Sequence, residues 1–280
     1  MTTDNAFTNA VPRAPSANTP WAVNYAQHVK QIIRHAAEHA PRSVQRTLGP
    51  SEIGSPCHRQ IVGKLVGATN PEHPGGQRTN HVPDMWPAIV GTSVHAWLAN
   101  TFDHENDTLG FMRYLTELRV SPTAEHPGST DLYDTAQRAV VDHKVLGPSS
   151  LAKIRSGKPP RKYFVQTLLY GLGCQLMGLP VERVVIIAYP RTEATLDSLY
   201  VWDHPVWSED DARLLSEVLR VNEVRKQIAD QVLKGVISIE EVPIVPDDSE
   251  CFFLPGSVPS TARRPRMAAQ DALARSAAGT

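Results

Sequence analysis

The feature that most constrains the fold is the stretch from residue 126 to residue 145, which reads HPGSTDLYDTAQRAVVDHKV. It contains two short strand-like pieces, Ser129–Tyr133 and Ala139–Lys144, separated by a polar turn around residues 135–137. Two such pieces on either side of turn-forming residues are typical of a β-hairpin. We therefore expect the chain to be organised around a sheet that includes these two strands.

Three ionisable side chains lie on this hairpin. Asp131 is on the first piece, and Asp142 and Lys144 are on the second. Because side chains alternate between the two faces of a strand, Asp142 and Lys144 point the same way and His143 points the other way. Two carboxylates and a lysine at the end of a hairpin indicate a site where the carboxylates hold a divalent cation and the lysine faces water or phosphate.

Helix-like and strand-like patterns alternate along the rest of the chain. Apolar residues at helical spacing predict helices at 21–37, 56–65, 87–102, 163–177 and 208–233. Alternating or continuous apolar runs predict strands at 114–121, 183–189 and 195–202, and residues 69–84 and 146–162 are predicted to be loops. This order predicts an α/β fold, a mixed β-sheet flanked by helices, with an N-terminal helical annex.

Composition divides the chain into four segments. Residues 1–20, rich in Thr, Asn, Ala and Pro, are predicted to be a disordered arm, and residues 21–85 an N-terminal helical region. Residues 86–240 hold the hairpin with the other predicted strands and are expected to form the core. Residues 241–280 are predicted to be a C-terminal extension that is largely disordered after residue 258.

Bulk properties limit the class of protein. The net charge of −1 gives no general attraction to nucleic acid, so a DNA-binding surface must be local. No apolar run approaches the roughly 18–20 residues that span a bilayer, and the first residues lack the order of a signal peptide. We therefore expect a cytoplasmic protein without a membrane partner. An odd number of cysteines far apart in sequence argues against a disulfide framework.

The hairpin belongs to an ordered set of polar residues. His95 lies on a predicted helix and Glu117 on a predicted strand, and Gln166 and Tyr170 share one face of a later predicted helix. Each of them alone has an ordinary interpretation, as a core histidine, an exposed strand residue or a buried polar pair. Their occurrence in this order around the acidic hairpin favours a catalytic site.

This set resembles the RecB-like branch of the PD-(D/E)xK nuclease superfamily, the branch that includes the exonucleases associated with CRISPR adaptation. The matching residues are Gly91 and His95 in GTSVH, Gly128 and Asp131 in GSTD, Asp142 and Lys144 in VVDHK, and Gln166 and Tyr170 in QTLLY. The resemblance covers about residues 51–202. Within the branch, the chain looks most like the RecB-like exonucleases of actinobacteriophages, which implies a restriction-endonuclease-like core.

The resemblance implies a metal site and a catalytic set. The implied metal ligands are His95, Asp131, Asp142 and, through its backbone carbonyl, His143. The implied catalytic residues are Asp131, Asp142 and Lys144, with Gln166 and Tyr170 steadying the site and the DNA. Beyond the resemblance, Glu117 on the neighbouring predicted strand is a further catalytic candidate, for contact with a metal through water or with Lys144. The expected metal is Mg²⁺ or Mn²⁺, and a histidine ligand tends to favour Mn²⁺.

Many nucleases of this branch also hold a four-iron–four-sulfur cluster on four cysteines. This chain has three cysteines, Cys57, Cys174 and Cys251. Because a four-thiolate cluster needs four cysteines, we expect no intact iron–sulfur cluster; a labile cluster with a non-cysteine ligand is the alternative. Cys174, on the helix of Gln166, is expected to be a small core thiol.

A basic run lies between the second hairpin strand and the helix of Gln166. Its members are Lys153, Arg155, Lys158, Arg161 and Lys162. Such a run is often plain solvent-exposed surface, but beside a metal site it favours sequence-independent contact with the DNA phosphate backbone.

The sequence therefore predicts a metal-dependent DNA exonuclease acting in phage recombination, replication or DNA-end processing. It would work in the cytoplasm of the infected bacterial host, with a recombination or adaptation protein as a candidate partner. One alternative is a flap-type endonuclease with the same site. Another is a non-catalytic accessory protein that keeps the nuclease fold for DNA binding. The complete set of two carboxylates and a lysine favours an enzyme.

Overall fold

The computed structural model describes residues 19–38, 48–67 and 86–243. Most of the arm predicted at 1–20, the loop predicted at 69–84 and the extension beyond residue 243, which includes Cys251, lie outside these ranges. The chain divides into two units, residues 1–40 and 41–280. The described part of the first unit is helix α1 (Pro20–Glu38), which confirms the helix predicted at 21–37. No helix in the described ranges combines the length and the apolar character needed to cross a membrane.

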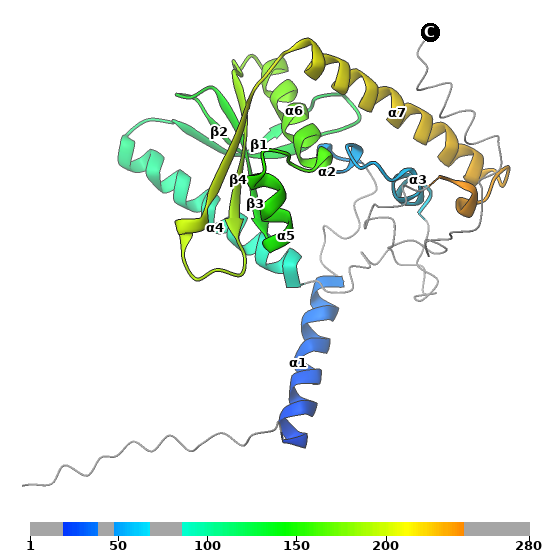
Figure 1. The fold of residues 1–280 in the computed structure, drawn as a ribbon, viewed down its shortest axis with the longest axis horizontal. Coiled ribbons are helices and arrows are strands. Elements are labelled where there is room, and N and C mark those ends of the chain that lie inside the picture. The colour runs from blue at the N-terminus through cyan, green and yellow to red at the C-terminus, as the bar shows by residue number, and fades with distance from the viewer. Residues whose placement is uncertain (1–18, 39–47, 68–85, 244–280) are drawn as a thin grey trace, which may run out of the picture. The chain divides into compact units, whose positions relative to one another are not determined.

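Among the described residues, five strands form one mixed sheet (Figure 1). They are β1 (Tyr114–Val120), β2 (Gly128–Asp134), β3 (Ala139–Leu146), β4 (Arg183–Pro190) and β5 (Tyr200–Pro205). The strands lie in chain order, and every neighbouring pair is antiparallel except β3 and β4, which are parallel. A parallel pair needs a long crossover connection, which two helices provide here. The predicted mixed sheet flanked by helices is confirmed.

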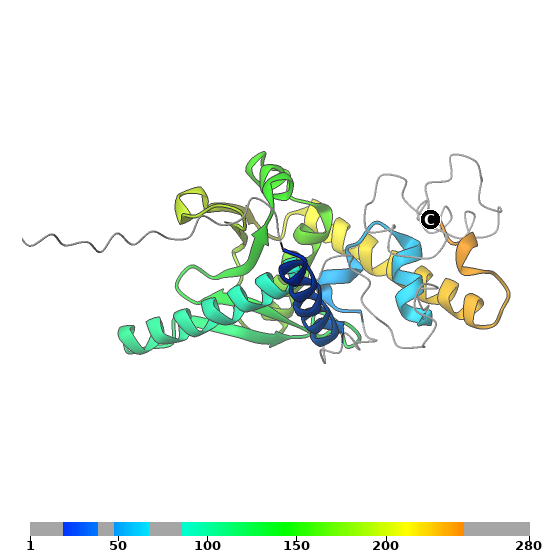
Figure 2. The same ribbon diagram turned by 90° about the horizontal axis from the view of Figure 1, so that it is seen from below.

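Helices cover both faces of the sheet (Figure 2). Helix α4 (Trp86–Leu109) packs on one face, and α5 (Pro148–Arg155) and α6 (Arg161–Leu176) pack on the other. The alternation of side chains along β3 sets this division. Val140 is buried in the cluster that contains Leu168 of α6, whereas its neighbour Val141 is buried in the cluster with Phe102 of α4.

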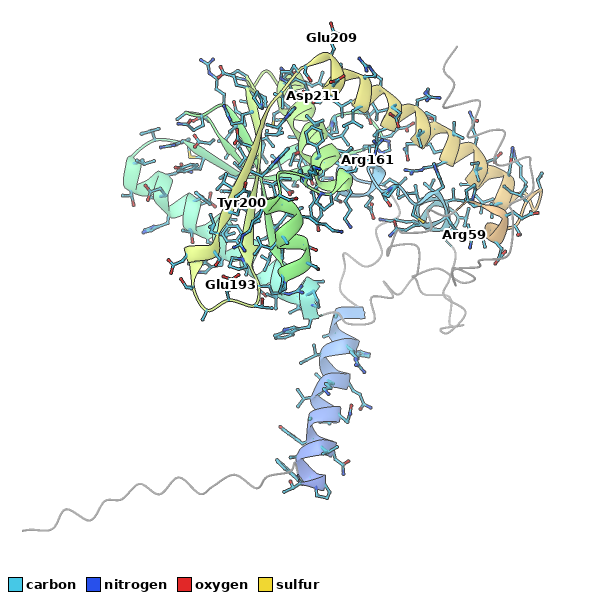
Figure 3. The ribbon with its side chains drawn as sticks, viewed as in Figure 1. Arg59, Arg161, Glu193, Tyr200, Glu209 and Asp211 are labelled. Carbon is cyan, nitrogen blue, oxygen red and sulfur yellow. The ribbon has the colours of Figure 1, made fainter. Side chains whose placement is uncertain are left out.

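A helical annex packs beside the sheet and combines segments that come before and after the sheet in the chain. It comprises α2 (Pro50–Ile53), α3 (His58–Val66), α7 (Glu209–Leu233) and the short 3₁₀ helix η3 (Ile239–Glu241). Val62 of α3 and Ile228 of α7 share one buried cluster. At the start of α7, Ser208 and Asp211 form the predicted capping box, and Figure 3 shows Asp211 in this first turn. The annex is therefore not formed by N-terminal residues alone.

Two local predictions were wrong. Residues 146–162 are not one loop, because α5 begins at Pro148 and buries Leu151 and Ile154, which are spaced by three residues as one helix face requires. The strand predicted at 195–202 begins at Tyr200 and runs to Pro205, and the residues before it form the 3₁₀ helix η2 (Leu196–Ser198).

Candidate active site

The two hairpin carboxylates lie where the pairing of β2 with β3 stops. The last pair of this ladder is Leu132 with Val141, so Asp131 and Asp142 are the first residues beyond it, opposite each other. The pairing of β1 with β2 also skips Asp131, because residues 116 and 118 pair on either side of it and Glu117 does not. Asp131 therefore lies at an opening in the sheet, which we call the fork, where the backbone leaves room for side-chain contacts.

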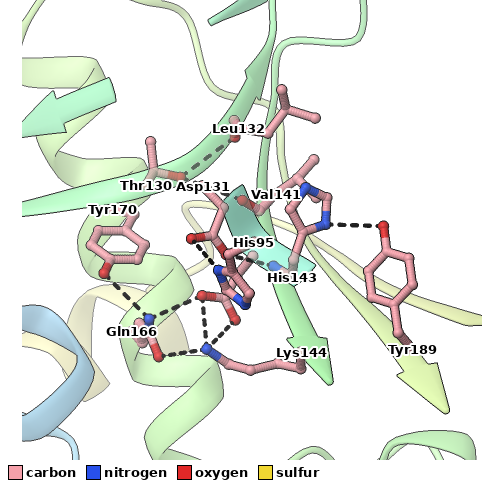
Figure 4. Close-up of polar contacts among 11 residues, drawn as sticks. His95, Thr130, Asp131, Leu132, Val141, His143, Lys144, Gln166, Tyr170 and Tyr189 are labelled. Carbon is pink, nitrogen blue, oxygen red and sulfur yellow. Dashed lines mark hydrogen bonds and ion pairs between the residues drawn. The ribbon is translucent and has the colours of Figure 1, made fainter. Parts of the chain in front are cut away.

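Asp131 replaces the missing backbone partner at the fork. Its Oδ2 accepts a hydrogen bond of 2.7 Å from the backbone N–H of His143, and its Oδ1 lies 3.2 Å from Nδ1 of His95 (Figure 4). Burial alone would raise the pKa of Asp131, but the hydrogen bond and charge of His95 hold it below its usual value. Burial would likewise lower the pKa of His95, and Asp131 raises it. Helix α4 and strand β2 thus meet through an imidazole–carboxylate pair.

Asp142 and Lys144 form a buried ion pair on the α6 side of the sheet. Lys144 Nζ donates to Asp142 Oδ1 at 2.9 Å and to Gln166 Oε1 at 3.1 Å. Gln166 Nε2 donates to the same Asp142 Oδ1 at 2.9 Å. The same nitrogen lies 3.3 Å from the hydroxyl of Tyr170 (Figure 4). Gln166 therefore bridges acid and base, and Tyr170 supports it one turn further along α6, as the spacing of four residues predicts.

One oxygen of this network remains unsatisfied. Asp142 is 1% exposed, and its Oδ2 lies 2.7 Å from Lys144 Nζ but has no partner with hydrogen-bond geometry. Burial, opposed by Lys144 and reinforced by Asp131, raises the pKa of Asp142 to about 6. Despite its own burial, Lys144 has a raised pKa because the two aspartates favour its charged form. An incompletely satisfied buried carboxylate is costly, so a function is the natural explanation for it.

His143 points to the opposite face of the sheet, as predicted. Its ring stacks on Phe102 of α4 at 5.8 Å, and its Nδ1 lies 3.2 Å from the hydroxyl of Tyr189 on β4. Burial lowers the pKa of His143 to about 4, so the ring is neutral at physiological pH. The backbone N–H of His143 points toward β2, and in a strand the carbonyl of the same residue points to the same side. The backbone carbonyl of His143, and not its ring, therefore faces the fork.

Glu117 lies in the same register row as the two aspartates, across β1, β2 and β3. Its φ of 46° is in the left-handed region, which is rare for a residue with a side chain and interrupts the strand locally. The side chain is exposed, and its negative charge is one of the smaller causes of the raised pKa of Tyr170, behind burial. The structure thus places Glu117 near the site, at its solvent-facing edge.

The basic run is distributed over several elements. Lys153 and Arg155 lie on α5, and Arg155 donates to the backbone carbonyl of Ser198 at 2.6 Å. Lys158 follows α5, and Arg161 at the start of α6 is 3.1 Å from Glu217 of α7. Lys162 lies close to Lys144, because its Nζ is 5.5 Å from the centre of the Tyr163 ring, and Lys144 Nζ is 5.0 Å from the same ring centre. These contacts separate Lys162 from Arg155 and Arg161, which bind other parts of the protein.

Three aromatic residues of the site were not predicted from the sequence. Phe102 and Tyr189 hold the ring of His143, and the Tyr163 ring lies 5.0 Å from Lys144 Nζ. A signal for Tyr163 was present, since it precedes Gln166 by three residues and therefore shares its helix face. Tyr189 could have been found only from the pairing of β3 with β4.

The cysteines have different environments. Cys174 is free and fully buried in α6, and burial raises the pKa of its thiol to about 12, so the prediction of a core thiol is confirmed. Cys57 is the N-cap of α3, where its Sγ accepts from the backbone N–H of Gln60 at 3.4 Å, and it is disulfide-bonded. The expectation that the cysteines form no disulfide framework stays a prediction. Cys251 lies outside the described residues, and the absence of an iron–sulfur cluster stays a prediction.

Comparisons with known proteins add little to this geometry. No family model matches the chain, and no curated protein matches it. Among solved structures, the chain is similar to an alkaline exonuclease from Laribacter hongkongensis, with 12% sequence identity and a TM-score of 0.45. The match covers 70% of this chain and 95% of that chain. A likeness this distant fixes neither a reaction nor a substrate.

Proposed function

We propose that the chain is a metal-dependent deoxyribonuclease that hydrolyses phosphodiester bonds of DNA, acting as an exonuclease. The observation that carries the proposal is the fork. There, Asp131 and Asp142 face each other beyond the last β2–β3 pair, with Lys144 ion-paired to Asp142. Two carboxylates and an ammonium in one partly buried place are the groups that phosphodiester hydrolysis requires.

The donor atoms at the fork fit a divalent cation. Among the described residues, no group of three or more His, Cys, Asp or Glu side chains is already arranged to hold a metal ion. The available donors are instead the pair of His95 with Asp131 and the buried, unsatisfied Oδ2 of Asp142. The charges of all three act on one another, as their shifted pKa values indicate. With the carbonyl of His143, this is a mainly oxygen donor set of the kind that suits Mg²⁺ or Mn²⁺.

The protein side chains have separate roles in the proposed reaction. A bound divalent cation would supply Lewis acidity and a lowered pKa for a coordinated water. Lys144 would stabilise the negative charge that develops on the phosphate, and Gln166 would hold its ammonium against Asp142. Tyr170 would fix the amide of Gln166. Lys162 would contact a neighbouring phosphate, because its ammonium lies beside the same ring as Lys144.

The proposal that DNA is cleaved from an end, and not at a flap, rests on the resemblance to RecB-like exonucleases. So do the roles in phage recombination, replication or end processing and the candidate recombination or adaptation partner. The placement among the CRISPR-associated or actinobacteriophage enzymes stays a prediction. The observation that favours an enzyme over a DNA-binding accessory protein is the intact ion pair of Asp142 and Lys144, which a binding role alone does not require.

The test is digestion of end-labelled linear DNA, single- and double-stranded, beside a covalently closed circle, with Mg²⁺, Mn²⁺ or EDTA. We expect metal-dependent loss of the linear substrates and no cleavage of the circle. The Asp142→Asn variant should lose cleavage but keep salt-sensitive DNA binding. The matched control is Asp230→Asn, on the exposed face of α7, which should cleave as the unaltered protein does.

Each other outcome has a defined meaning. Cleavage of the circle would favour the endonuclease alternative. Binding without cleavage in either metal would favour the accessory protein. Undiminished cleavage by Asp142→Asn would contradict the assignment of the site.

A further inference from the structure

Tyr163 has a contact that the proposed catalytic set does not yet explain. It lies in the first turn of α6, three residues before Gln166 and seven before Tyr170, so all three share one face of the helix. The centre of its ring is 5.0 Å from Lys144 Nζ, within the range of an attractive cation–π interaction. The side chain of Lys144 is only 16% exposed, which strengthens such an attraction because little water competes for the ammonium.

The ring constrains Lys144 without using a hydrogen-bond donor. The ammonium has three N–H groups, and contacts with Asp142 and Gln166 already use part of this capacity. A hydroxyl or amide in place of the ring would compete with a phosphate oxygen for the remaining donor. The π face instead attracts the positive charge as a whole, so an N–H group stays available to a substrate.

The ring is itself held by the core. Tyr163 packs against the buried cluster that contains Leu151 and Ile154 of α5, and its backbone N–H donates to the Pro160 carbonyl at 2.9 Å. A ring that packs against α5 cannot move freely, so it limits the positions that the Lys144 ammonium can take. The packing of α5 against the start of α6 thus helps to position Lys144, although neither Asp131 nor Asp142 lies on these helices.

We propose that Tyr163 is a positioning residue for Lys144: its aromatic face holds the ammonium between Asp142 and the substrate phosphate by a cation–π interaction. The inference rests on the proposed nuclease function. It assigns to Tyr163 a part in the turnover rate, beyond filling space next to α5.

The test replaces Tyr163 by phenylalanine and then by mono-, di- and trifluorinated phenylalanine. Fluorine withdraws electron density from the π face and changes ring volume little. Tyr163→Phe should keep the turnover rate, because the hydroxyl is not part of the contact. Along the fluorinated series kcat should fall stepwise, by about tenfold in total. Lys162 Nζ also lies 5.5 Å from the centre of this ring, so a rise in KM for DNA without a fall in kcat would report on Lys162 and would overturn the inference.

Phe164 provides the matched control. It is the next residue of α6, and its ring packs edge-on against Trp202 and His204 at 5.6 and 4.9 Å. The same fluorinated series at this position should leave kcat unchanged. A flat series at Tyr163, or an equal fall at Phe164, would overturn the inference while leaving the nuclease proposal in place.

A second readout does not depend on activity. The ε-methylene protons of Lys144 are one bond from the ammonium that lies over the Tyr163 ring, so they should resonate upfield in the unaltered protein and in Tyr163→Phe. They should return to ordinary shifts in Tyr163→Leu. Ordinary shifts in the unaltered protein would show that the contact is absent and would overturn the inference. A shifted resonance in a protein that cleaves no DNA would instead count against the nuclease function, and with it against a role for Tyr163 in turnover.

Discussion

The fork and the helical annex both bury charged side chains, but they satisfy them differently. In the annex, Arg225 of α7 is 3% exposed and donates to the carbonyls of Ile53 and Ser55 and to Nδ1 of His58. At the fork, Asp142 is buried to the same degree but keeps one oxygen without a hydrogen bond. In the annex, buried charge therefore joins neighbouring elements. At the fork, a buried carboxylate oxygen is still able to accept a hydrogen bond or to bind a ligand.

The electrostatic consequences also differ. Burial lowers the pKa of Arg225 to about 10, yet the guanidinium stays charged at neutral pH and binds the C-terminal end of α2 to α7. Arg59 of α3 does the same toward η3 by donating to the carbonyls of Val242 and Glu240, and Figure 3 shows it beside the far end of α7. A satisfied buried charge of this kind stabilises a fold, while the incompletely satisfied fork favours ligand binding.

The sharpest test of this contrast is Lys144→Met. We expect kcat for DNA cleavage to fall by at least about 100- to 1,000-fold, since the variant loses the charge that stabilises the transition state. At pH 5 the free energy of unfolding should change by less than about 1 kcal/mol, because methionine keeps the buried stem and Asp142, with a pKa of about 6, is already mostly protonated there. Urea denaturation of the same sample measures the second quantity. A large loss of stability would show that the fork is structural in the same way as the annex.

The converse test is Arg225→Met. This change leaves two carbonyls and an imidazole without their donor, so we expect a loss of about 3 kcal/mol in the free energy of unfolding. The folded variant should keep its kcat. Arg213→Met, on the exposed face of α7, is the control and should cost less than about 0.5 kcal/mol. If activity fell in proportion to stability, the two regions would not be separable.

The pH dependence of stability should have opposite signs in the two regions. Burial, with the charge of Arg225, lowers the pKa of His58 to about 4, below its ordinary value of 6.5. The unfolded chain therefore binds the extra proton first, and this contribution to stability is lost as pH falls from about 6.5 to about 4. Asp142, whose pKa is raised from 3.8 to about 6, has the opposite effect, because stability decreases as pH rises through that window.

The measurement is urea denaturation as a function of pH for His58→Gln and Asp142→Asn. His58→Gln should reduce the acid-side loss, since glutamine can still accept from Arg225 but does not titrate. Asp142→Asn should make the curve rise more steeply with pH between about 4 and 6. An unchanged pH profile in both variants would show that neither group is shifted as the structure indicates.

The smallest effect is expected at Glu117. Its φ of 46° costs free energy that glycine avoids, although glycine also adds flexibility to the unfolded chain. We expect Glu117→Gly to be about 0.5 kcal/mol more stable and less active, a combination that marks strain kept for function. Urea denaturation and the cleavage assay measure the two quantities. A variant that is less stable would indicate that the Glu117 side chain contributes more to the fold than its backbone costs.

Much of the candidate site could be predicted from local sequence. The spacing of Gln166 and Tyr170 fixes their common helix face, and the alternation of Asp142, His143 and Lys144 fixes which of them face α6. Counting back from the hairpin turn also places Asp131 opposite Asp142. These features follow from the repeats of helix and strand, which depend only on residues close together in the chain.

Other features could not be predicted in this way. The prolines, glycines and charges after β3 predict a loop and hide the short apolar spacing of Leu151 and Ile154. The annex was assigned to the N-terminal part of the chain, although Arg225 and Ile228, far along the sequence, complete it. Pairings between distant segments leave no local pattern, because each half of the contact is satisfied only when both are folded.

The sequence by itself determined the hairpin, the helix faces and the identity of the acids, the lysine and the histidine that the fork brings together. The tertiary structure decided that the β2–β3 ladder stops just before Asp131 and Asp142, that α4 presents His95 to the first of them, and that α5 holds Tyr163 against Lys144. The physical reason is the range of the interactions. The periodicity of helices and strands, and the conformational propensities of the residues, depend on a few neighbours in the chain. Where the β2–β3 pairing ends, and which charges are buried, depends on the whole packed sheet.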